Sequence, residues 1–277
     1  MKNTIKVLLE ILVGVIFLIW GKYYADDNLR PELYGMAIGI SAALLIEFIS
    51  FIYDEWAFLG LYINCFTYKK RPAIRLTISY LYKIELQGKY LLVKSNRLQN
   101  TFQPVGGVYK YFDPEATNEL NCMSIVTDNH IPNDDVNEYD LRLKMNKRKN
   151  IRKFLKWFFS NKEREFDPWR EFYEELVESQ ILPASVFKYI HYDLVGQHFE
   201  PIHFDTRFNI DTFKYADIYT PKFVTDEQKE EVRKLISVNS PEFIWATEQE
   251  ILNKTTTDGK RIADHTFKIF HTKRLHE

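Results

Sequence analysis

Two apolar runs dominate the first sixty residues of the chain. The first, residues 5–20, contains only Lys6 and Glu10 as charged residues, and the second, residues 33–53, contains only Glu47. A helix needs about 20 residues to cross about 30 Å of hydrocarbon, and both runs approach this length. The pattern therefore predicts two transmembrane helices. A cleaved signal peptide is the alternative for the first run, although no small-residue cleavage site follows it.

Flanking charges predict how such a hairpin, residues 1–60, would be oriented. Two lysines precede the first run and four Lys or Arg residues follow the second, whereas the connecting loop holds two basic and three acidic residues. By the positive-inside rule, both termini should then lie in the cytoplasm. Glu10 and Glu47 would lie within the spans, where a charged carboxylate costs about 2.5 kcal/mol or more. Either they reach the interface or bind a proton, or several copies associate and the carboxylates line a polar seam.

After the second apolar run, the spacing between apolar residues changes. From residue 76 to residue 84, apolar or aromatic side chains occupy every second position, and a Gln-Gly turn leads to residues 89–94 (KYLLVK). This alternation predicts a β-hairpin. A glycine pair, Gly106 and Gly107, follows; by itself such a pair indicates only a tight turn or a bulge.

The segment 167–178 (DPWREFYEELVE) predicts a helix with two unlike faces. Asp167 suits the N-cap and Pro168 the first helical position. At 100° per residue, the aromatic and aliphatic side chains fall on one side, and the other side carries Glu171, Glu174, Glu175 and Glu178. Clustered carboxylates bind hard divalent cations such as Mg²⁺. The alternative is a solvated acidic face that is softened by an Arg170–Glu174 ion pair.

A long polar and basic stretch separates the glycine pair from this helix. Its second half, residues 142–164, holds ten Lys or Arg residues interleaved with aromatic and aliphatic ones. A basic amphipathic helix of this kind lies on anionic headgroups or packs on its own domain. The alternative is a wall that faces phosphate, in which Lys156 supplies charge and Trp157 stacks on a base.

The composition narrows the possible partners. The formal net charge is −1, and hydrophobic residues make up 45% of the chain. This charge gives no overall attraction to nucleic acid, so no DNA partner is expected, and the apolar fraction is enough for a sizeable core. Two cysteines, Cys65 and Cys122, are too few for a disulfide framework and fit a reducing compartment.

The order strand, turn, strand, Pro-Val-Gly-Gly and then a helix reading R-E-x-x-E-E resembles the signature of the Nudix fold. Residues 243–252 (FIWATEQEIL) are similar to the strand-to-helix passage near the end of many Nudix domains. The resemblance implies an α/β domain, an α-β-α sandwich, over residues 72–254 with a long insertion at about 113–166. The two transmembrane helices of residues 1–60 would precede it, and a C-terminal tail, residues 255–277, would follow it.

The resemblance also implies roles for individual residues. In the Nudix family the glutamates of this helix hold the metal ions that bridge a diphosphate, and the arginine orients them. Carried over by position, the Mg²⁺ ligands would be Glu171, Glu174 and Glu175, and Arg170 would be the orienting residue. The Gly106–Gly107 pair would be part of the ligand-binding site.

Three departures from the family pattern concern hydrolysis. More than fifty residues separate the glycine pair from the helix. Lys162 stands eight positions before Arg170, where the loop glutamate is expected, and Val177 stands where a glycine should follow the glutamate pair. The resemblance thus implies a metal-binding helix in a damaged hydrolytic motif, and we assign no catalytic residue.

Two N-terminal spans joined to a degenerate Nudix domain are similar to the SMODS-associated Nudix proteins of CBASS antiphage systems. This resemblance implies an effector in the bacterial inner membrane that binds a cyclic nucleotide made by a partner nucleotidyltransferase. Its helices would then assemble as a homo-oligomer and disrupt the lipid bilayer. The alternatives are a membrane-tethered, Mg²⁺-dependent Nudix hydrolase of nucleoside diphosphate derivatives and a membrane scaffold whose Nudix domain binds protein.

Overall fold

The computed structural model divides the chain into two compact units, Met1–Gly60 and Leu61–Glu277. The structure describes residues 2–26, 28–68, 70–128, 130, 138–270 and 272, without the side chains of residues 2–10 and 47–55.

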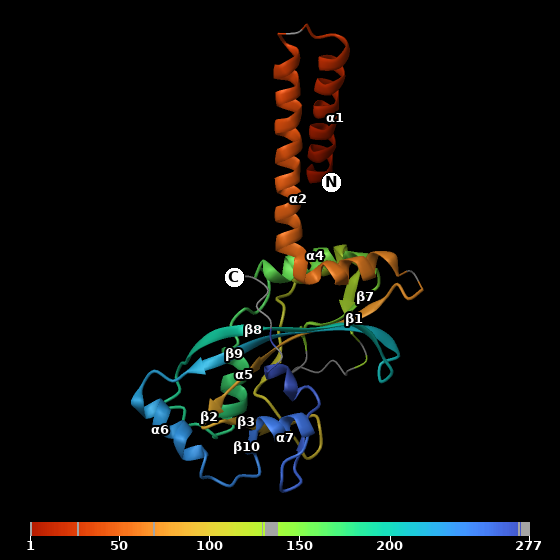
Figure 1. Ribbon diagram of the computed structural model, residues 1–277. Helices are drawn as coiled ribbons and strands as arrows, with labels where there is room; N and C mark the ends of the chain where they lie inside the picture. Colours follow the sequence, from red (N-terminus) through yellow and green to blue (C-terminus); the bar gives the residue numbers. More distant parts are fainter. Residues whose placement is uncertain are drawn as a thin grey trace. The chain divides into compact units, whose positions relative to one another are not determined.

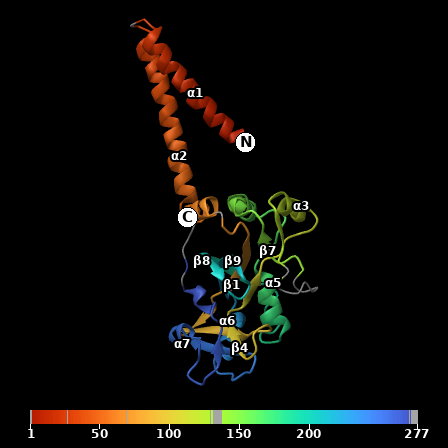
Figure 2. The ribbon, with the colours of Figure 1, turned by 90° about the vertical axis from the view of Figure 1, so that its right-hand side faces the viewer.

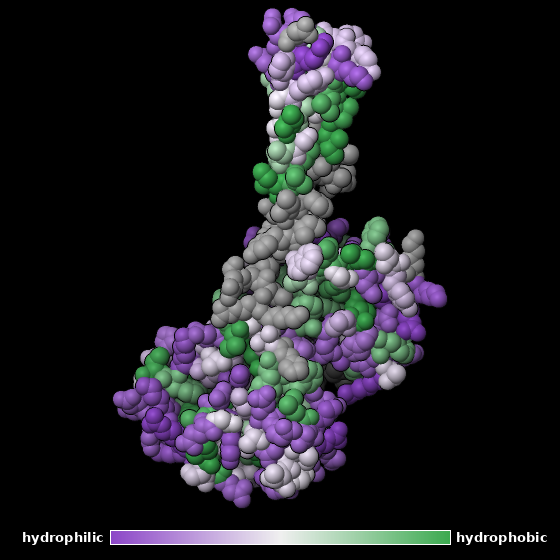
Figure 3. Space-filling model, in the orientation of Figure 1, coloured by the Kyte–Doolittle hydropathy of each residue, from purple (hydrophilic) through white to green (hydrophobic). Residues whose placement is uncertain are grey.

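The first unit is built from two antiparallel helices, α1 (Lys2–Tyr23) and the larger part of α2 (Arg30–Thr67) (Figures 1 and 2). Arg30 closes the turn between them, because its guanidinium donates to the carbonyl oxygens of Gly21 (3.0 Å) and Ala25 (3.2 Å). Apolar side chains lie on the described surface of this unit, where Ile38 is 67% exposed (Figure 3).

Within the described part of the chain, no helix is both long enough and apolar enough to cross a membrane. This finding corrects the prediction of two transmembrane helices and of a two-pass location in the bacterial inner membrane. Charged residues shorten both apolar runs: 11 uncharged residues lie between Glu10 and Lys22, and 14 lie between Glu32 and Glu47. At 1.5 Å per residue, these stretches cover about 17 and about 21 Å of the roughly 30 Å required. The side chains of Glu10 and Glu47 lie outside the described ones.

The second unit is an α/β domain with two sheets. The larger sheet has the strand order β6-β7-β1-β9-β8, and β5 pairs with β1. Strands β1 and β9 run parallel, whereas the other pairs of this sheet are antiparallel. The strands are β1 (Ile74–Tyr82), β5 (Gly106–Val108), β6 (Ile125–Thr127), β7 (Arg142–Met145), β8 (His191–Asp205) and β9 (Ile210–Lys222).

The smaller sheet has the order β10-β3-β4-β11, and β2 pairs with β3. Apolar side chains of the two sheets meet in one core, to which the larger sheet contributes Leu81 and Ile218 and the smaller sheet Leu92 and Ile244. The strands are β2 (Glu85–Leu86), β3 (Lys89–Lys94), β4 (Thr101–Gln103), β10 (Phe243–Thr247) and β11 (Arg261–Ile262).

The predicted hairpin of residues 76–94 is only partly confirmed. Gln87 and Gly88 turn the chain with positive φ angles of 54° and 74°, but the strands that they join are β2 and β3. Strand β1 belongs to the other sheet, because β9 pairs along one of its edges while β5 and β7 pair along the other. No edge of β1 is therefore left for β3 among the described strands.

Short helices complete the second unit, and two of them begin at side-chain caps. Thr225 Oγ1 accepts the Gln228 N–H, and Thr247 forms a capping box with Glu250. The helices are α3 (Glu115–Cys122), α4 (Ile151–Phe159), α5 (Trp169–Phe172), α6 (Asp226–Leu235) and α7 (Glu248–Asn253), with the one-turn helices η1 (Arg148–Asn150) and η3 (Thr266–Ile269). Helix α5 continues as a π-helix, η2 (Tyr173–Glu178).

The basic insertion contributes α4, which packs on its own domain. The apolar side chains of α4 are buried, and the ring of Phe158 lies 5.6 Å from Tyr109 and 5.6 Å from Tyr215 between ring centroids. The Arg164 guanidinium lies 3.7 Å from the centroid of the Phe158 ring. Phe154, Trp157 and Phe158 of the insertion are thus buried in the domain's own core.

We expect Phe158→Ala to destabilise the full chain by about 3–5 kcal/mol, because it leaves a cavity where a fully buried ring packs on two tyrosines. The exposed Lys153 on the same helix gives the matched control, and Lys153→Ala should change stability by about 0.5 kcal/mol or less. Urea unfolding measures both. Equal effects of the two substitutions would show that α4 is not packed on the domain.

Candidate functional site

The acidic helix begins one residue later than the sequence predicts, because α5 starts at Trp169 and Pro168 occupies the N-cap position. Asp167 Oδ1 accepts the Trp169 N–H at 2.8 Å, which satisfies one of the free amides of the first turn. The backbone widens to a π-helix from Tyr173 to Glu178, so the glutamate pair lies in the widened part. Such π segments occur frequently at functional sites.

The glycine pair and the acidic helix are in direct contact, although more than sixty residues separate them. Glu175 Oε2 accepts the Gly106 N–H at 2.8 Å. The Glu171 carboxylate lies against Gly107, where an added Cβ would be 1.8 Å from Glu171 Oε1. Gly106 has a φ of +145° and lies so close to β1 that an added Cβ would be 2.3 Å from the Tyr80 carbonyl oxygen. Position 106 therefore requires glycine, because both its backbone conformation and the neighbouring backbone exclude a Cβ, whereas a Cβ at Gly107 would require the Glu171 side chain to move.

Arg170 ties this helix to its surroundings. Its Nε donates to Glu165 Oε1 at 2.9 Å, and its Nη1 donates to Glu171 Oε1 at 2.7 Å and to Glu174 Oε2 at 3.2 Å. Its Nη2 donates to the Val108 carbonyl at 3.0 Å, which fixes the helix to β5. The arginine thus orients two of the three predicted metal ligands.

Glu165 is a residue that the spacing argument missed. It lies five positions before Arg170 rather than eight, and its Oε2 also accepts the Lys110 N–H at 3.2 Å. The loop before it turns sharply, because Asn161 and Glu163 both have positive φ angles, 57° and 59°. This tight loop places Glu165, and not the residue eight positions before Arg170, beside the arginine. In the sequence, the only sign of this is the high density of charged residues from Lys162 onward.

The buried carboxyl of Glu175 has an unusually high pKa. Burial raises the pKa of Glu175 to about 8, and the neighbouring Glu171 adds repulsion, whereas the hydrogen bond from Gly106 opposes the shift. Burial also raises the pKa of Glu174, against the attraction of Arg170. The helix therefore retains protons that exposed glutamates would lose.

These bonds decide whether the helix can hold a metal. Within the described residues, no group of three or more His, Cys, Asp or Glu side chains is arranged around a possible metal position. Glu171 and Glu174 bond to Arg170, and Glu175 bonds to a backbone amide. In this arrangement the carboxylates do not fit a divalent cation, so Mg²⁺ stays a prediction from the resemblance.

A cavity of about 340 Å³ opens beside the start of α5. Aromatic, cationic and acidic side chains line it: Lys110, Phe112, Glu165, Phe166, Asp167, Trp169 and Arg170. Phe112 and Phe166 are 55% and 66% exposed, so their rings are accessible to a ligand. The predicted ligand-binding residues Lys156 and Trp157 lie on α4, the first exposed and the second buried, and neither is among the described residues of this lining.

A buried polar network lies between the sheet and this region. Asp217 accepts hydrogen bonds from the hydroxyls of Tyr109 and Tyr215, both at 2.8 Å, and the Tyr109 and Tyr219 hydroxyl oxygens are 3.1 Å apart. Burial raises the pKa of Asp217, and the two tyrosine hydrogen bonds counter this. Alternation along β9 predicts a strand here but does not predict this network.

A glycine pair held against an R-E-x-x-E-E helix defines the second unit as a Nudix-type domain. Residues 73–270 match the family model described as the SMODS-associated NUDIX domain, and the chain therefore belongs to that family. No curated protein is similar enough to count as a match.

The acidity of Glu175 predicts a pH dependence of stability. The unfolded side chain loses its proton near pH 4.5, whereas the folded one retains it to about pH 8, so the folded state binds more protons in this window. The free energy of unfolding should therefore fall as the pH rises from 5 to 8, by on the order of 1 kcal/mol per pH unit. Glu175→Gln keeps an acceptor for Gly106 without a titrating group, so this contribution should disappear. Urea unfolding at several pH values measures both chains, and parallel profiles would exclude Glu175 as the source.

Proposed function

We propose that the Nudix-like domain is a nucleotide sensor that binds a cyclic oligonucleotide in the cavity beside α5 and does not hydrolyse it. The observation that carries this proposal is the lining of that cavity. Exposed aromatic rings and two cationic side chains face the same space at the start of the acidic helix.

This lining suits both parts of a nucleotide. Phe112, Phe166 and Trp169 offer flat faces on which a base can stack. Lys110 supplies positive charge for a phosphate group. Glu165 is bonded to Arg170, and Asp167 accepts hydrogen bonds from the Trp169 N–H and the Tyr192 hydroxyl.

The hydrogen bonds and ion pairs that the carboxyl groups already form favour nucleotide binding over nucleotide hydrolysis. Glu171 and Glu174 both bond to Arg170, and burial raises the pKa of Glu175 to about 8. Carboxyl groups in these states are poor metal ligands and poor bases. The competing proposal, a hydrolase of nucleoside diphosphate derivatives, is supported by one observation, the direct contact between the acidic helix and the glycine pair.

Family membership supports the signalling role. The matched family is named for its association with SMODS. Part of our proposal is therefore that a partner nucleotidyltransferase makes the cyclic nucleotide during antiphage defence, as in CBASS systems. Assembly of several copies on ligand binding completes the proposal; it requires that the ligand bind the assembled form more tightly than the single chain.

The stacking part of this proposal predicts the effect of one substitution. Phe166→Ala should weaken binding of a cyclic dinucleotide or trinucleotide by about 1–3 kcal/mol, because it removes one exposed ring that stacks on a base. Tyr189 is a matched control, since it is 59% exposed and lies outside the described lining. Fluorescence titration of the full chain against a panel of cyclic nucleotides gives the affinities. Equal affinities of wild type, Phe166→Ala and Tyr189→Ala would remove this cavity as the site.

A measurement of nucleotide hydrolysis distinguishes the proposed sensor from the competing hydrolase. Binding should persist in excess EDTA, and bound nucleotide should be recovered intact after prolonged incubation with Mg²⁺. Chromatography of the nucleotide in the titrated samples makes this measurement. A kcat of about 1 s⁻¹ or more, an ordinary enzyme rate, would establish the hydrolase instead.

A further inference from the structure

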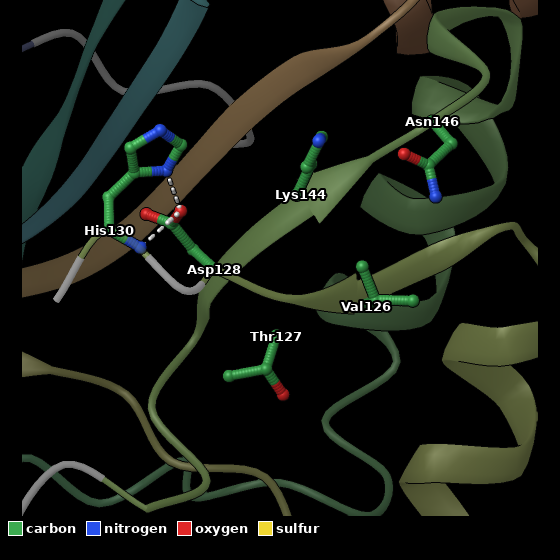
Figure 4. Close-up of a pocket in the computed structure, with 6 residues that line it drawn as sticks. All are labelled: Val126, Thr127, Asp128, His130, Lys144 and Asn146. Atoms are coloured by element: carbon green, nitrogen blue, oxygen red, sulfur yellow. Dashed lines mark hydrogen bonds and ion pairs between the residues drawn. The ribbon is translucent and has the colours of Figure 1, made fainter. Parts of the chain in front are cut away.

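A second cavity, of about 320 Å³, lies at the β6–β7 end of the larger sheet (Figure 4). Its lining consists of Val126, Thr127, Asp128, His130, Lys144 and Asn146. The two cavities share no residue among the described lining residues, so this one is separate from the proposed nucleotide site.

Strand pairing fixes the walls of this cavity. Val126 pairs with Lys144 across β6 and β7, so both side chains project from the same face of the sheet. The Asn146 N–H donates to the Ser124 carbonyl at 2.9 Å, and the Asp128 N–H donates to the Arg142 carbonyl at 3.0 Å. Backbone hydrogen bonds thus fix the backbone of Asn146 and of Asp128 beside the cavity.

The negative charge in the lining is already balanced. The Asp128 side chain is only 1% exposed and forms an ion pair with Arg75, whose side chain is 4% exposed. Arg75 is held in turn by Thr77, whose hydroxyl accepts at 2.8 Å, and by the ring of Phe208, which lies 4.1 Å from the guanidinium carbon. Asp128 therefore adds no uncompensated charge to the cavity.

The same carboxylate orients a histidine toward a ligand. Asp128 Oδ1 bonds to His130 Nδ1 and accepts the His130 N–H at 3.2 Å (Figure 4). With Nδ1 engaged, Nε2 is the ring nitrogen that remains for a ligand, and the side chain is 40% exposed. Lys144, a further residue of the lining, forms no ion pair with any residue that the structure describes.

We propose that this cavity is a binding site for a phosphate group, either inorganic phosphate or a phosphomonoester. The Lys144 ammonium and the Asn146 amide donate to phosphate oxygens. His130 Nε2 accepts from a P–OH group or, when protonated, donates to a P–O group. This site is independent of the nucleotide cavity at α5.

The test is a ³¹P NMR titration of the full chain with inorganic phosphate. Wild type should show saturable binding in the millimolar range, and Lys144→Met should weaken it about tenfold or more, because a charge-assisted hydrogen bond is lost. Lys149→Met is the matched control, since it removes an exposed positive charge on η1 and should leave binding unchanged. Asn146→Ala is a second variant at an exposed position, and it should weaken binding about threefold or more.

Three outcomes would overturn the proposal: no saturable binding by wild type, equal losses in both lysine variants, or unchanged binding in Asn146→Ala when Lys144→Met fails to fold. Circular dichroism reports the folding of each variant. A parallel titration with a 5′-mononucleotide distinguishes the sources, because a site for the free ion responds to inorganic phosphate alone, whereas a site for the phosphate group responds to both. Phe166→Ala should not change phosphate binding here, so failure of this site and failure of the nucleotide site are distinguishable.

Discussion

One guanidinium group holds the candidate site together. The acidic helix presents several carboxylates on one face, and like charges this close repel one another unless a cation lies between them. Arg170 supplies that cation, and its bond to the Val108 carbonyl also ties the helix to the sheet. The contact with the glycine pair and the polarity of the neighbouring cavity both depend on this arrangement. The candidate site is therefore a cluster of ion pairs centred on Arg170, beside a cavity lined by aromatic side chains.

Local patterns predicted the local parts of this arrangement well. The hydrogen bond from the Trp169 N–H to Asp167 and the acidic face of the helix depend on residues a few positions apart, and both are found. Pairing between distant strands was not predictable in the same way. Alternation shows that residues 74–82 form a strand, but their parallel partner is β9, more than 130 residues later in the chain. The same limit explains why Glu165 was missed, since its position depends on the backbone turns of the loop before it.

The N-terminal helices and the insertion show a different limit of structure prediction from hydropathy. Counting apolar residues predicted two spans, but Glu10 and Lys22 bound one uncharged stretch and Glu32 and Glu47 bound the other, and no described helix qualifies as a span. In the insertion, the amphipathic pattern left open which surface covers the apolar side of the helix. The structure shows that the domain itself does so, through contacts of Phe158 with aromatic residues on other elements. An amphipathic pattern identifies a face that must be covered, but not what covers it.

The close approach of Gly107 to Glu171 has an evolutionary consequence. Because the space above this glycine is filled by a carboxylate, any larger residue at position 107 would require the side chain at position 171 to move or to be shorter. The two positions should therefore change together in related chains, although one lies in a strand and the other in a helix far along the sequence. A chain that keeps glycine at the first position while losing the glutamate at the second would have an open space at this point. Such paired changes would mark where, in the family, the acidic helix has been released from the sheet.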